Sequence, residues 1–294
     1  MTIRRTTASG HDALLLVSTL LQRVRLVDPL AGMWEAADVQ WWWRRPRESD
    51  DLEQHFWVDD DGPVAGVWLT SWGADLWNCD PILVPGATGP ALDIVWAQAR
   101  EQVGRHASGK VVVPVPSTDP ALEALALTAD MVVGSRDHTA WLDIDERQAA
   151  RSPAPGYRIV DRTGRAGSPH PMRPRNGDDV AERLGVCPLY DPALDLAVET
   201  ADGGVAGYVL CWSDPVTGVG LVEPVRVEDD HQRRGLATAM VSEGVERLAA
   251  AGARRVKIGF GTEAAGAVYT GVGFKPTSTA AWFEAPVSAL RTSA

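Results

Sequence analysis

The chain has 294 residues, enough for one large domain or two ordinary ones, and its 45% hydrophobic residues are ample for a buried core. It carries 28 basic and 39 acidic residues, and the first 150 residues hold 12 of the basic and 22 of the acidic ones, so most of the net charge of −11 lies there. Neither half has the basic character of a nucleic-acid binder, and no apolar run reaches the length of a membrane span.

Cysteine and histidine usage argues against metal and disulfide chemistry. The three cysteines, Cys79, Cys187 and Cys211, form no Cys-x-x-Cys pair, and the six histidines are scattered. We therefore expect no metal site. We also expect reduced thiols in a cytoplasmic protein, because the N-terminal residues lack the apolar stretch of a secretory signal. The acidic first half is most simply a solvated surface, and attraction of a cationic amine is the alternative.

The N-terminal half begins with a predicted helix and an aromatic segment. Apolar residues at helical spacing favour an amphipathic helix over residues 11–25. Three tryptophans at 41–43 precede two arginines. They either stack on bases or a cofactor ring, or pack in the core and a domain interface, which is the simpler interpretation. Residues 56–58 and 63–69, separated by an acidic turn ending at Gly62, predict a β-hairpin.

A near match to a phosphate-binding loop follows. Residues 104–110 fit the P-loop pattern until Val111 replaces the required Ser or Thr. They also follow a predicted helix (91–103) and precede a predicted strand (111–115), the reverse of the order that places a helix N-terminus on phosphate. We interpret them as a helix-to-strand connection.

Blocks of the first half recur in the second at offsets of 141 to 143 residues. The matching blocks are 61–69 with 202–210, 80–84 with 223–227, and 140–141 with 281–282. Three blocks in one order at nearly one offset predict two related domains in tandem. The Pro-rich segment 151–156 is the expected linker.

The second half opens with strand and turn signals and then reaches its most informative stretch. Residues 156–160 predict a strand, 164–176 a loop and 178–184 the start of a helix, while residues 196–200 and 205–212 predict a hairpin.

Next, β-branched residues at 219–227 predict a strand, and apolar residues at helical spacing predict a helix from near Thr238 to Gly252. The turn between them, residues 232–237, reads Gln-x-x-Gly-x-Ala. A strand that leads through a short loop into a helix leaves several backbone N–H groups unpaired, with the helix dipole behind them. Such a site fits a pyrophosphate.

This turn and a later segment resemble the GNAT superfamily of acetyl-CoA-dependent N-acetyltransferases. The family pattern Gln/Arg-x-x-Gly-x-Gly/Ala matches residues 232–237. Residues 262–274, which contain Tyr269 and end in Gly-Phe, are similar to the family's closing Asn-x-x-Ala-x-x-x-Tyr and Gly-Phe. The resemblance covers residues 199–284, and the tandem layout is similar to that of mycothiol synthase.

The resemblance implies an α/β (α+β) fold of two tandem GNAT-like domains, each a mixed, mostly antiparallel sheet flanked by helices. Residues 1–150 would form a degenerate domain and residues 156–294 the catalytic one. In the first copy, residues 85–90 are too short for the cofactor turn, and Pro90 removes a backbone donor. Thr128 stands where the second copy has Tyr269. A supporting or cleft-shaping role is expected for the first domain.

The implied activity is transfer of the acetyl group of acetyl-CoA, the cosubstrate, to an amine of a small-molecule acceptor in a ternary complex. Tyr269 would protonate the leaving thiolate, and Glu223 is the first candidate for the general base, with Glu199 second. Tyr190 would line the acceptor side. The residues implied in cofactor binding are Val225, Arg226, Val227, Gln232, Arg233, Arg234, Gly235, Leu236, Ala237, Thr238, Thr262, Ala265 and Tyr269.

Details of the binding mode and other functions stay open. Pro224 is expected to disrupt the strand ladder so that Val225 and Val227 polarise the acetyl carbonyl. Thr262 replaces the family's usual Asn, which weakens the expected contact there. The alternative function is a non-catalytic acyl-CoA-binding module or sensor, and a third is a binding protein for a cationic metabolite. We expect no nucleic-acid or membrane partner, and a monomer or homodimer.

Overall fold

The computed structural model describes residues 2–290, which form two compact units. Within the described chain, unit 1 comprises residues 2–39, 46–137 and 278–290, and unit 2 comprises residues 40–45 and 138–277. No helix in residues 2–290 combines the length and apolar character that a membrane crossing requires.

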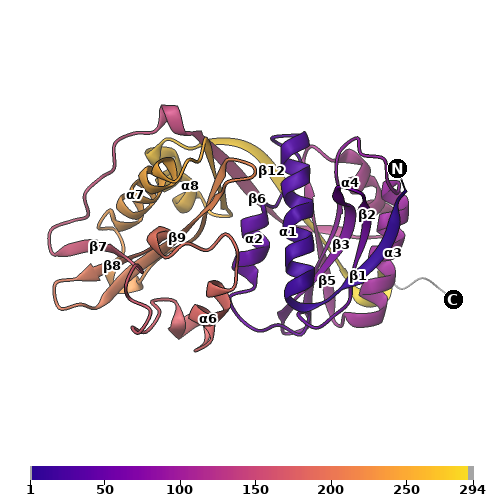
Figure 1. The fold of residues 1–294 in the computed structure, drawn as a ribbon, viewed down its shortest axis with the longest axis horizontal. Helices are drawn as coiled ribbons and strands as arrows, with labels where there is room; N and C mark the ends of the chain where they lie inside the picture. The colour runs from indigo at the N-terminus through magenta and orange to yellow at the C-terminus, as the bar shows by residue number, and fades with distance from the viewer. Residues whose placement is uncertain (1, 291–294) are drawn as a thin grey trace. The chain divides into compact units, whose positions relative to one another are not determined.

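Unit 1 is a six-stranded sheet with helices on both faces. Its elements are β1 (Arg4–Ala8), α1 (Gly10–Val27), the start of α2 (Ala36–Trp42), β2 (Gln54–Asp59), β3 (Gly62–Gly73), β4 (Leu76–Leu83), α3 (Leu92–His106), β5 (Lys110–Pro116), α4 (Pro120–Thr128), the end of β12 (Lys275–Pro286) and α9 (Val287–Leu290). The strand order is β1-β2-β3-β4-β5-β12, and only β4 and β5 are parallel. Helices α1 and α3 flank the strands on opposite sides (Figure 1).

Burial explains why these segments form these elements. Residues 64–71 of β3 are all buried, as expected for a central strand covered by helices on both faces. On α1, Leu14, Val17 and Leu21 recur at helical spacing and are buried, while Leu15 faces outward. The core of the unit joins one face of the sheet to the buried side of α3, around Val95, which is fully buried.

Unit 2 repeats this plan with its own helices. Its elements are the end of α2, the end of β6 (Val132–Asp143), β7 (Tyr157–Asp161), α5 (Arg173–Asn176), α6 (Val180–Gly185), β8 (Asp195–Thr200), β9 (Val205–Asp214), β10 (Val219–Val227), α7 (Leu236–Ala250), β11 (Arg255–Phe260), α8 (Glu263–Val272) and the start of β12, with 3-10 turns at Ile144–Glu146, Pro192–Leu194 and Asp229–His231. The order is β6-β11-β10-β9-β8-β7, parallel only between β10 and β11. Helices α7 and α8 lie side by side, and α6 lies on the other side of β8 and β9 (Figure 1).

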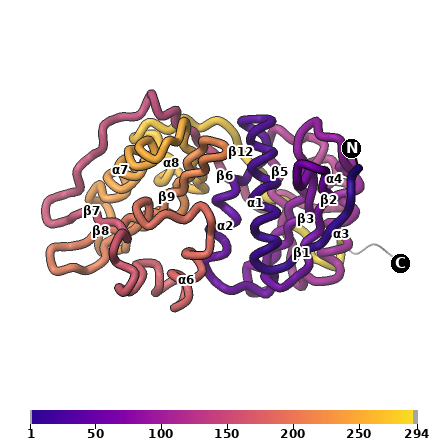
Figure 2. The backbone as a smooth tube through the Cα atoms, viewed as in Figure 1, coloured from indigo at the N-terminus to yellow at the C-terminus, as the bar shows by residue number. Residues whose placement is uncertain are grey.

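Each sheet is completed by a strand from the opposite half of the chain. Residues Ala280–Pro286 of β12 pair with β5 in unit 1, so the C-terminal part of the tube runs beside a strand from the first half (Figure 2). In unit 2, residues 138–143 of β6 pair with β11. These added strands cover β5 and β11, which would otherwise expose unpaired backbone groups along one edge.

The structure confirms the predicted fold class and most predicted elements. The helix predicted at 11–25 is α1, the strand at 219–227 is β10, and residues 104–110 do connect α3 to β5. The predicted loop at 164–176 ends in the four-residue helix α5, which Pro174 helps to start because its fixed φ suits a first helical turn. The assignment of residues 1–150 to a degenerate domain and 156–294 to a catalytic one stays a prediction.

Candidate active site

Strand β10 separates from its parallel neighbour part-way along its length. It pairs with β11 only over Val219–Leu221, whereas on its other side it pairs with β9 as far as Val227. The register of the β9 pairing shifts between Val222 and Val225, around Pro224, as the sequence predicted. The last residues of β10 therefore have an open edge toward β11, where backbone groups are available to a ligand.

The N-terminus of α7 lies directly after this open edge. Its N-cap residue, Gly235, has a φ of 74° and offers no capping side chain, and Arg233 also has a positive φ, of 60°. Among the described residues, none accepts a hydrogen bond from the backbone N–H groups of Arg233 to Thr238, and the first intrahelical bond joins Ala239 N to Gly235 O at 3.0 Å. A run of unpaired donors at the positive end of a helix dipole is an anion site.

A cavity of about 520 Å³ lies between this helix N-terminus, the end of β10 and the first turns of α8. It is lined by Val225, Arg226, Val227, Gln232, Arg233, Gly235, Leu236, Ala237, Thr238, Ala264, Ala265, Val268 and Tyr269. Eleven of these thirteen residues belong to the set implied in cofactor binding by the sequence; Ala264 and Val268 do not. Both lie on the same face of α8 as Ala265 and Tyr269, so the helical period was the signal that would have found them.

The charge of the cavity lining is positive. Among the thirteen described residues that line it, the ionisable groups are Arg226, Arg233 and Tyr269. The guanidinium of Arg226 forms an ion pair with Asp229 at 2.8 Å, but its buried Nε has no hydrogen-bond partner among the described residues. An anionic ligand would complete the hydrogen bonding of this arginine.

Three residues of the predicted set have side chains bonded within the protein: Gln232, which lines the cavity, and Arg234 and Thr262, which do not. The Gln232 side chain, although it lines the cavity, donates to Asp229 Oδ1 at 3.1 Å and so fixes the turn before α7. Arg234 does not line the cavity; it donates to the hydroxyl of Tyr157 at 2.9 Å. Thr262 is the N-cap of α8 and accepts a hydrogen bond from Ala265 N at 3.3 Å, so its side chain stabilises the helix start.

Tyr269 places a phenol hydroxyl at the wall of the cavity. Its side chain is 8% exposed and packs edge-on against Phe260 and Phe274, at centroid distances of 6.0 and 6.4 Å. Burial, with a smaller contribution from the charge of Glu223, raises the pKa of Tyr269 to about 12. The phenol therefore keeps its proton at every physiological pH, and it lies close enough to Glu223 for the two groups to interact.

Glu223 lies at the point where β10 departs from its ladder. Its backbone carbonyl accepts a hydrogen bond from Trp212 Nε1 at 2.9 Å, which fixes the strand just before Pro224. Its carboxylate acts on Tyr269 and also on Arg44, whose pKa falls to about 10 because of burial and neighbouring Arg45, against the opposing charge of Glu223. Glu223 thus interacts electrostatically with a guanidinium and with a phenol of unit 2.

Arg44 is a site neighbour that sequence reasoning missed. Its guanidinium stacks on the ring of Trp41 at 3.8 Å and donates to Asn176 Oδ1 at 2.7 Å. Trp41 and Trp42 are buried, in agreement with the packing interpretation of the aromatic segment. Nothing in the sequence pairs residue 44 with a strand residue almost 180 positions later, so only the fold reveals this neighbour.

Tyr190 and Glu199, expected near the acceptor and as the second base, have other partners. The Tyr190 hydroxyl donates to the buried Asp195 at 2.8 Å. Glu199 forms ion pairs with Arg158, at 2.7 Å, and with Arg165. Its pKa is lowered because, despite partial burial, hydrogen bonds from both arginines favour the ionised form. A carboxylate held ionised by two arginines is a poorer base than one without them. Within residues 2–290, no cluster of three or more His, Cys, Asp or Glu side chains is arranged to hold a metal ion.

Comparison with known proteins gives one sequence family and one fold. Residues 168–274 match the acetyltransferase (GNAT) family. A mycothiol acetyltransferase from Clavibacter michiganensis subsp. michiganensis is 29% identical over 184 residues, which are 61% of this chain and 56% of that protein, so the match spans little more than half of the relative.

Two solved structures share the fold over almost the whole chain. A tandem GNAT protein from the clavulanic acid biosynthesis pathway superposes with a TM-score of 0.67 at 18% identity, covering 97% of this chain and 99% of that one. A GCN5-related N-acetyltransferase from Sphaerobacter thermophilus gives 0.62 at 16% identity, covering 97% and 96%. Because both likenesses include both units, the chain has the tandem GNAT fold, and its residues 168–274 match the acetyltransferase (GNAT) family.

Proposed function

We propose that unit 2 catalyses transfer of the acetyl group of acetyl-CoA to an amine of a small-molecule acceptor. The observation that carries the proposal is the cavity in which the unpaired amides before α7, the open edge of β10 and Tyr269 converge. The corresponding helix of unit 1, α3, has the acidic Asp93 in its first turn, and we propose that unit 1 takes no part in the transfer chemistry.

Binding of the cosubstrate follows from the two ends of this cavity. The pyrophosphate of coenzyme A would accept hydrogen bonds from the N–H groups of residues 233–238, and Arg226 and Arg233 would add positive charge. The pantetheine arm carries amides, which would pair with the open backbone edge of β10 at Val225 and Val227. The thioester would then lie between β10 and Tyr269.

The transfer itself needs one bond formed, one broken and two protons moved. The neutral amine nitrogen attacks the thioester carbon, the carbon–sulfur bond breaks, and the acceptor nitrogen loses a proton. Glu223 would take that proton, directly or through water, while backbone N–H groups of β10 stabilise the oxyanion. Glu223 interacts electrostatically with one guanidinium, that of Arg44, whereas Glu199 forms ion pairs with two arginines, so Glu223 is the better candidate for the base.

Tyr269 would protect the leaving sulfur from becoming an unsolvated thiolate. A phenol with a pKa of about 12 is a weak acid, but burial weakens thiols as acids in the same way: it raises the pKa of Cys211 in this unit to about 12. A thiolate released in a dry cavity is therefore basic enough to accept the Tyr269 proton, or at least a strong hydrogen bond from it.

A charge placed in the first turn of α7 tests the binding half of the proposal. In Thr238→Asp a carboxylate lies where the pyrophosphate would bind, yet an acidic residue at this end stabilises the helix, so folding is preserved. We expect calorimetry to show at least a ~100-fold loss of coenzyme A affinity. Thr238→Asn, equal in size but neutral, is the matched control and should bind within ~3-fold of wild type.

Turnover then separates an enzyme from a binding module. Thiol release from acetyl-CoA should be measured for wild type with a panel of amino sugars, amino acids, polyamines and aryl amines. Acceptor-dependent release would support the transferase, whereas tight coenzyme A binding without release for any amine would favour the acyl-CoA sensor. If wild type bound no coenzyme A, or if Thr238→Asp bound it normally, the proposed site would be wrong.

A further inference from the structure

Unit 1 contains a cavity of its own at the place that corresponds to the candidate active site. Strand β4 pairs with β5 only over Leu76–Asn78 and then separates from it, just as β10 separates from β11 after three residues. A cavity of about 320 Å³ lies in this opening, a volume at the lower end of small-molecule sites. The matching blocks of the sequence align Asp80 here with Glu223 in unit 2.

The lining of this cavity excludes the ligand proposed for unit 2. Among its eighteen residues there is no Lys, Arg or His, whereas three are aspartates: Asp28, Asp80 and Asp119. The helix after β4 begins with Asp93 in its first turn, and no residue of that helix lines the cavity. A pyrophosphate would meet carboxylates instead of unpaired amides and arginines.

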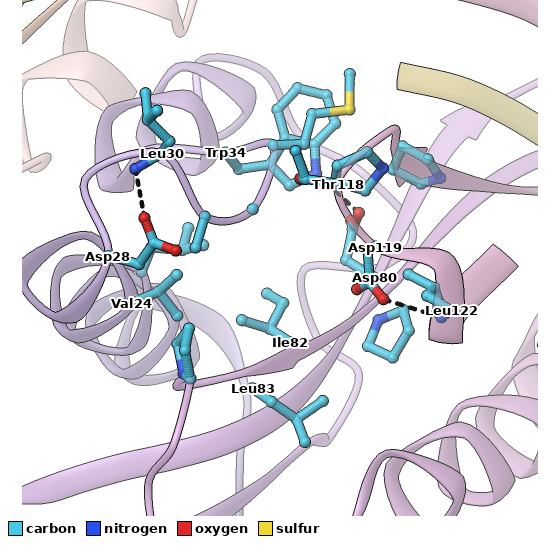
Figure 3. A pocket seen from close by; sticks show the side chains of 18 residues that line it. Val24, Asp28, Leu30, Trp34, Asp80, Ile82, Leu83, Thr118, Asp119 and Leu122 are labelled. Atoms are coloured by element: carbon cyan, nitrogen blue, oxygen red, sulfur yellow. Dashed lines mark hydrogen bonds between the residues drawn. The ribbon is translucent and has the colours of Figure 1, made fainter. Parts of the chain in front are cut away.

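The aspartates lie on two sides of an apolar floor. Figure 3 shows Asp28 on one side of the cavity, Asp80 and Asp119 on the opposite side, and the side chains of Ile82 and Leu83 between them. Asp28 and Asp119 each use Oδ1 to accept a backbone hydrogen bond, from Leu30 N at 2.9 Å and Leu122 N at 3.0 Å; among the described residues neither Oδ2 has a donor.

Asp80 is the buried member of this set. It is 4% exposed and accepts hydrogen bonds from Trp34 Nε1 at 2.8 Å and from the Asn78 amide. Asn78 is fully buried, and its Oδ1 accepts no hydrogen bond from the described residues. Asn78 does not line the cavity, but each carboxylate oxygen of Asp80 accepts one hydrogen bond and can accept a second, so a ligand in the cavity that donates hydrogen bonds would complete Asp80.

We propose that the cavity of unit 1 is a second ligand site that binds an aliphatic compound carrying ammonium groups, with a short diamine as the best match. An ammonium is a cation with only donors, which matches the buried Asp80 and the Oδ2 atoms of the exposed Asp28 and the half-buried Asp119. A methylene chain matches the apolar floor, and a second ammonium would reach Asp28 on the other side (Figure 3). This inference does not depend on the transferase proposed for unit 2.

Ionisation of Asp80 supplies a signature of binding at this site. Burial raises the pKa of Asp80 to about 7, with a further increase from the charge of Asp38, while the hydrogen bonds from Trp34 and Asn78 oppose the rise. Asp28 and Asp119 also face the cavity. An ammonium beside Asp80 favours its ionised form, so binding at pH 7 should release part of a proton.

Isothermal titration calorimetry of the full chain with 1,4-diaminobutane is the test. We expect saturable binding, weaker binding of butylamine, and no heat from butane-1,4-diol. Asp80→Asn should lower the affinity about 10-fold to 100-fold, and Asp28→Asn, which can keep the turn through its amide oxygen, about 3-fold to 10-fold. Asp61→Asn, an exposed aspartate of the same unit in the β2–β3 turn, is the control and should bind normally.

The same titration distinguishes this site from an acceptor site in unit 2. The buffer takes up the proton that Asp80 releases, so the heat of diamine binding to wild type should differ between two buffers with different ionisation enthalpies. Asp80→Asn should remove this difference. The same variant should still bind coenzyme A as wild type does. Three results would each overturn the proposal. The first is that the chain binds no diamine, and the second is that it binds the diol as well as the diamine. The third is that Glu223→Gln abolishes diamine binding while both aspartate variants leave it unchanged.

Discussion

The sheets of the two units have the same gap between two parallel strands, but the residues that line the gap carry opposite charge in the two units. In both, two parallel strands pair over three residues and then separate, and in both a cavity fills the opening. In unit 2 the lining carries arginines and the unpaired amides of a helix N-terminus; in unit 1 it carries three aspartates. The strand arrangement makes a cavity, and the segment that follows the strand decides which ligand it suits.

The difference lies in a few residues after the strand. Residues 228–235 of unit 2 lead into α7 with two positive-φ residues and no cap, which leaves amides unpaired. Residues 84–91 of unit 1 include two prolines, the amide of Ile94 in the first turn of α3 is bonded to Ala91 O and to Asp93 Oδ1, and no residue of α3 lines the cavity. Duplication of a fold therefore need not duplicate the site.

Removal of the proposed acid and base should have the largest effect. If unit 2 alone carries the chemistry, Tyr269→Phe and Glu223→Gln should each lower kcat by about 10²- to 10⁴-fold, because each removes a proton transfer. The KM for acetyl-CoA should change little, since neither residue contacts the proposed pyrophosphate site. Steady-state kinetics by thiol release would measure both parameters.

Thr128→Val is the matched control in unit 1. Thr128 is the counterpart of Tyr269, and its hydroxyl donates only to Ala124 O within its own helix, at 2.7 Å. We expect kcat to be unchanged. Equal losses for Thr128→Val and Tyr269→Phe would contradict the assignment of the chemistry to unit 2.

Stability against pH should expose the buried carboxylate of unit 1. The folded pKa of Asp80, about 7, exceeds the ordinary value of 3.8, so Asp80 stabilises the folded state fully below about pH 4, and this contribution is lost as pH rises through 7. Three pKa units correspond to about 4 kcal/mol at most. Denaturant unfolding at pH 5 and pH 8 should therefore show a smaller pH-dependent loss for Asp80→Asn than for wild type.

The same unfolding measurement should be repeated with saturating diamine. A bound ammonium favours ionised Asp80, so the ligand should restore part of the wild-type stability at pH 8 and do little for Asp80→Asn. Asp61→Asn should follow wild type throughout. An identical pH dependence for wild type and Asp80→Asn would show that Asp80 titrates normally.

Much of unit 2 could be predicted from the sequence because its signals are local. The strand ending at Val227, the turn at Gly235 and the helix after it follow one another in the chain, so their order alone places the amides next to the strand edge. Eleven of the predicted binding residues line one cavity for this reason. Thr262 and Arg234 lie outside it, since a capping bond and a contact with Tyr157 direct their side chains elsewhere.

The rest depended on contacts that sequence spacing cannot encode. Arg44 reaches the surroundings of Glu223 only because the end of α2 belongs to unit 2. The cavity of unit 1 combines Asp28, Asp80 and Asp119, which come from three segments with no shared motif. Likewise, no pattern in residues 275–286 shows that the last strand completes the sheet of unit 1.

Loss of a single guanidinium should weaken coenzyme A binding moderately. Arg233 is exposed and lines the cavity, so Arg233→Ala should lower the affinity by about 10-fold, with a smaller loss at 0.5 M salt because exposed charges are screened. Arg234→Ala, next in the chain but bonded to Tyr157, should cost less than about 3-fold. Titrations at two salt concentrations would check both, and the reverse order would place the pyrophosphate on the Arg234 side.

The smallest effect tests whether the backbone itself, and not a side chain, forms the anion site. Gly235 at the start of α7 and Gly252 after its end both have positive φ, 74° and 89°, and a Cβ at either position meets no atom within 4 Å. Alanine at each position should therefore cost a similar ~1 kcal/mol of stability from backbone strain alone. Only Gly235→Ala should also lower coenzyme A affinity, by about 3-fold to 5-fold, because relief of that strain turns the amides of residues 235–238 away from the cavity. Equal affinities for the two variants, at equal cost in unfolding free energy, would mean that the amides do not hold the ligand and that the arginines of the cavity do.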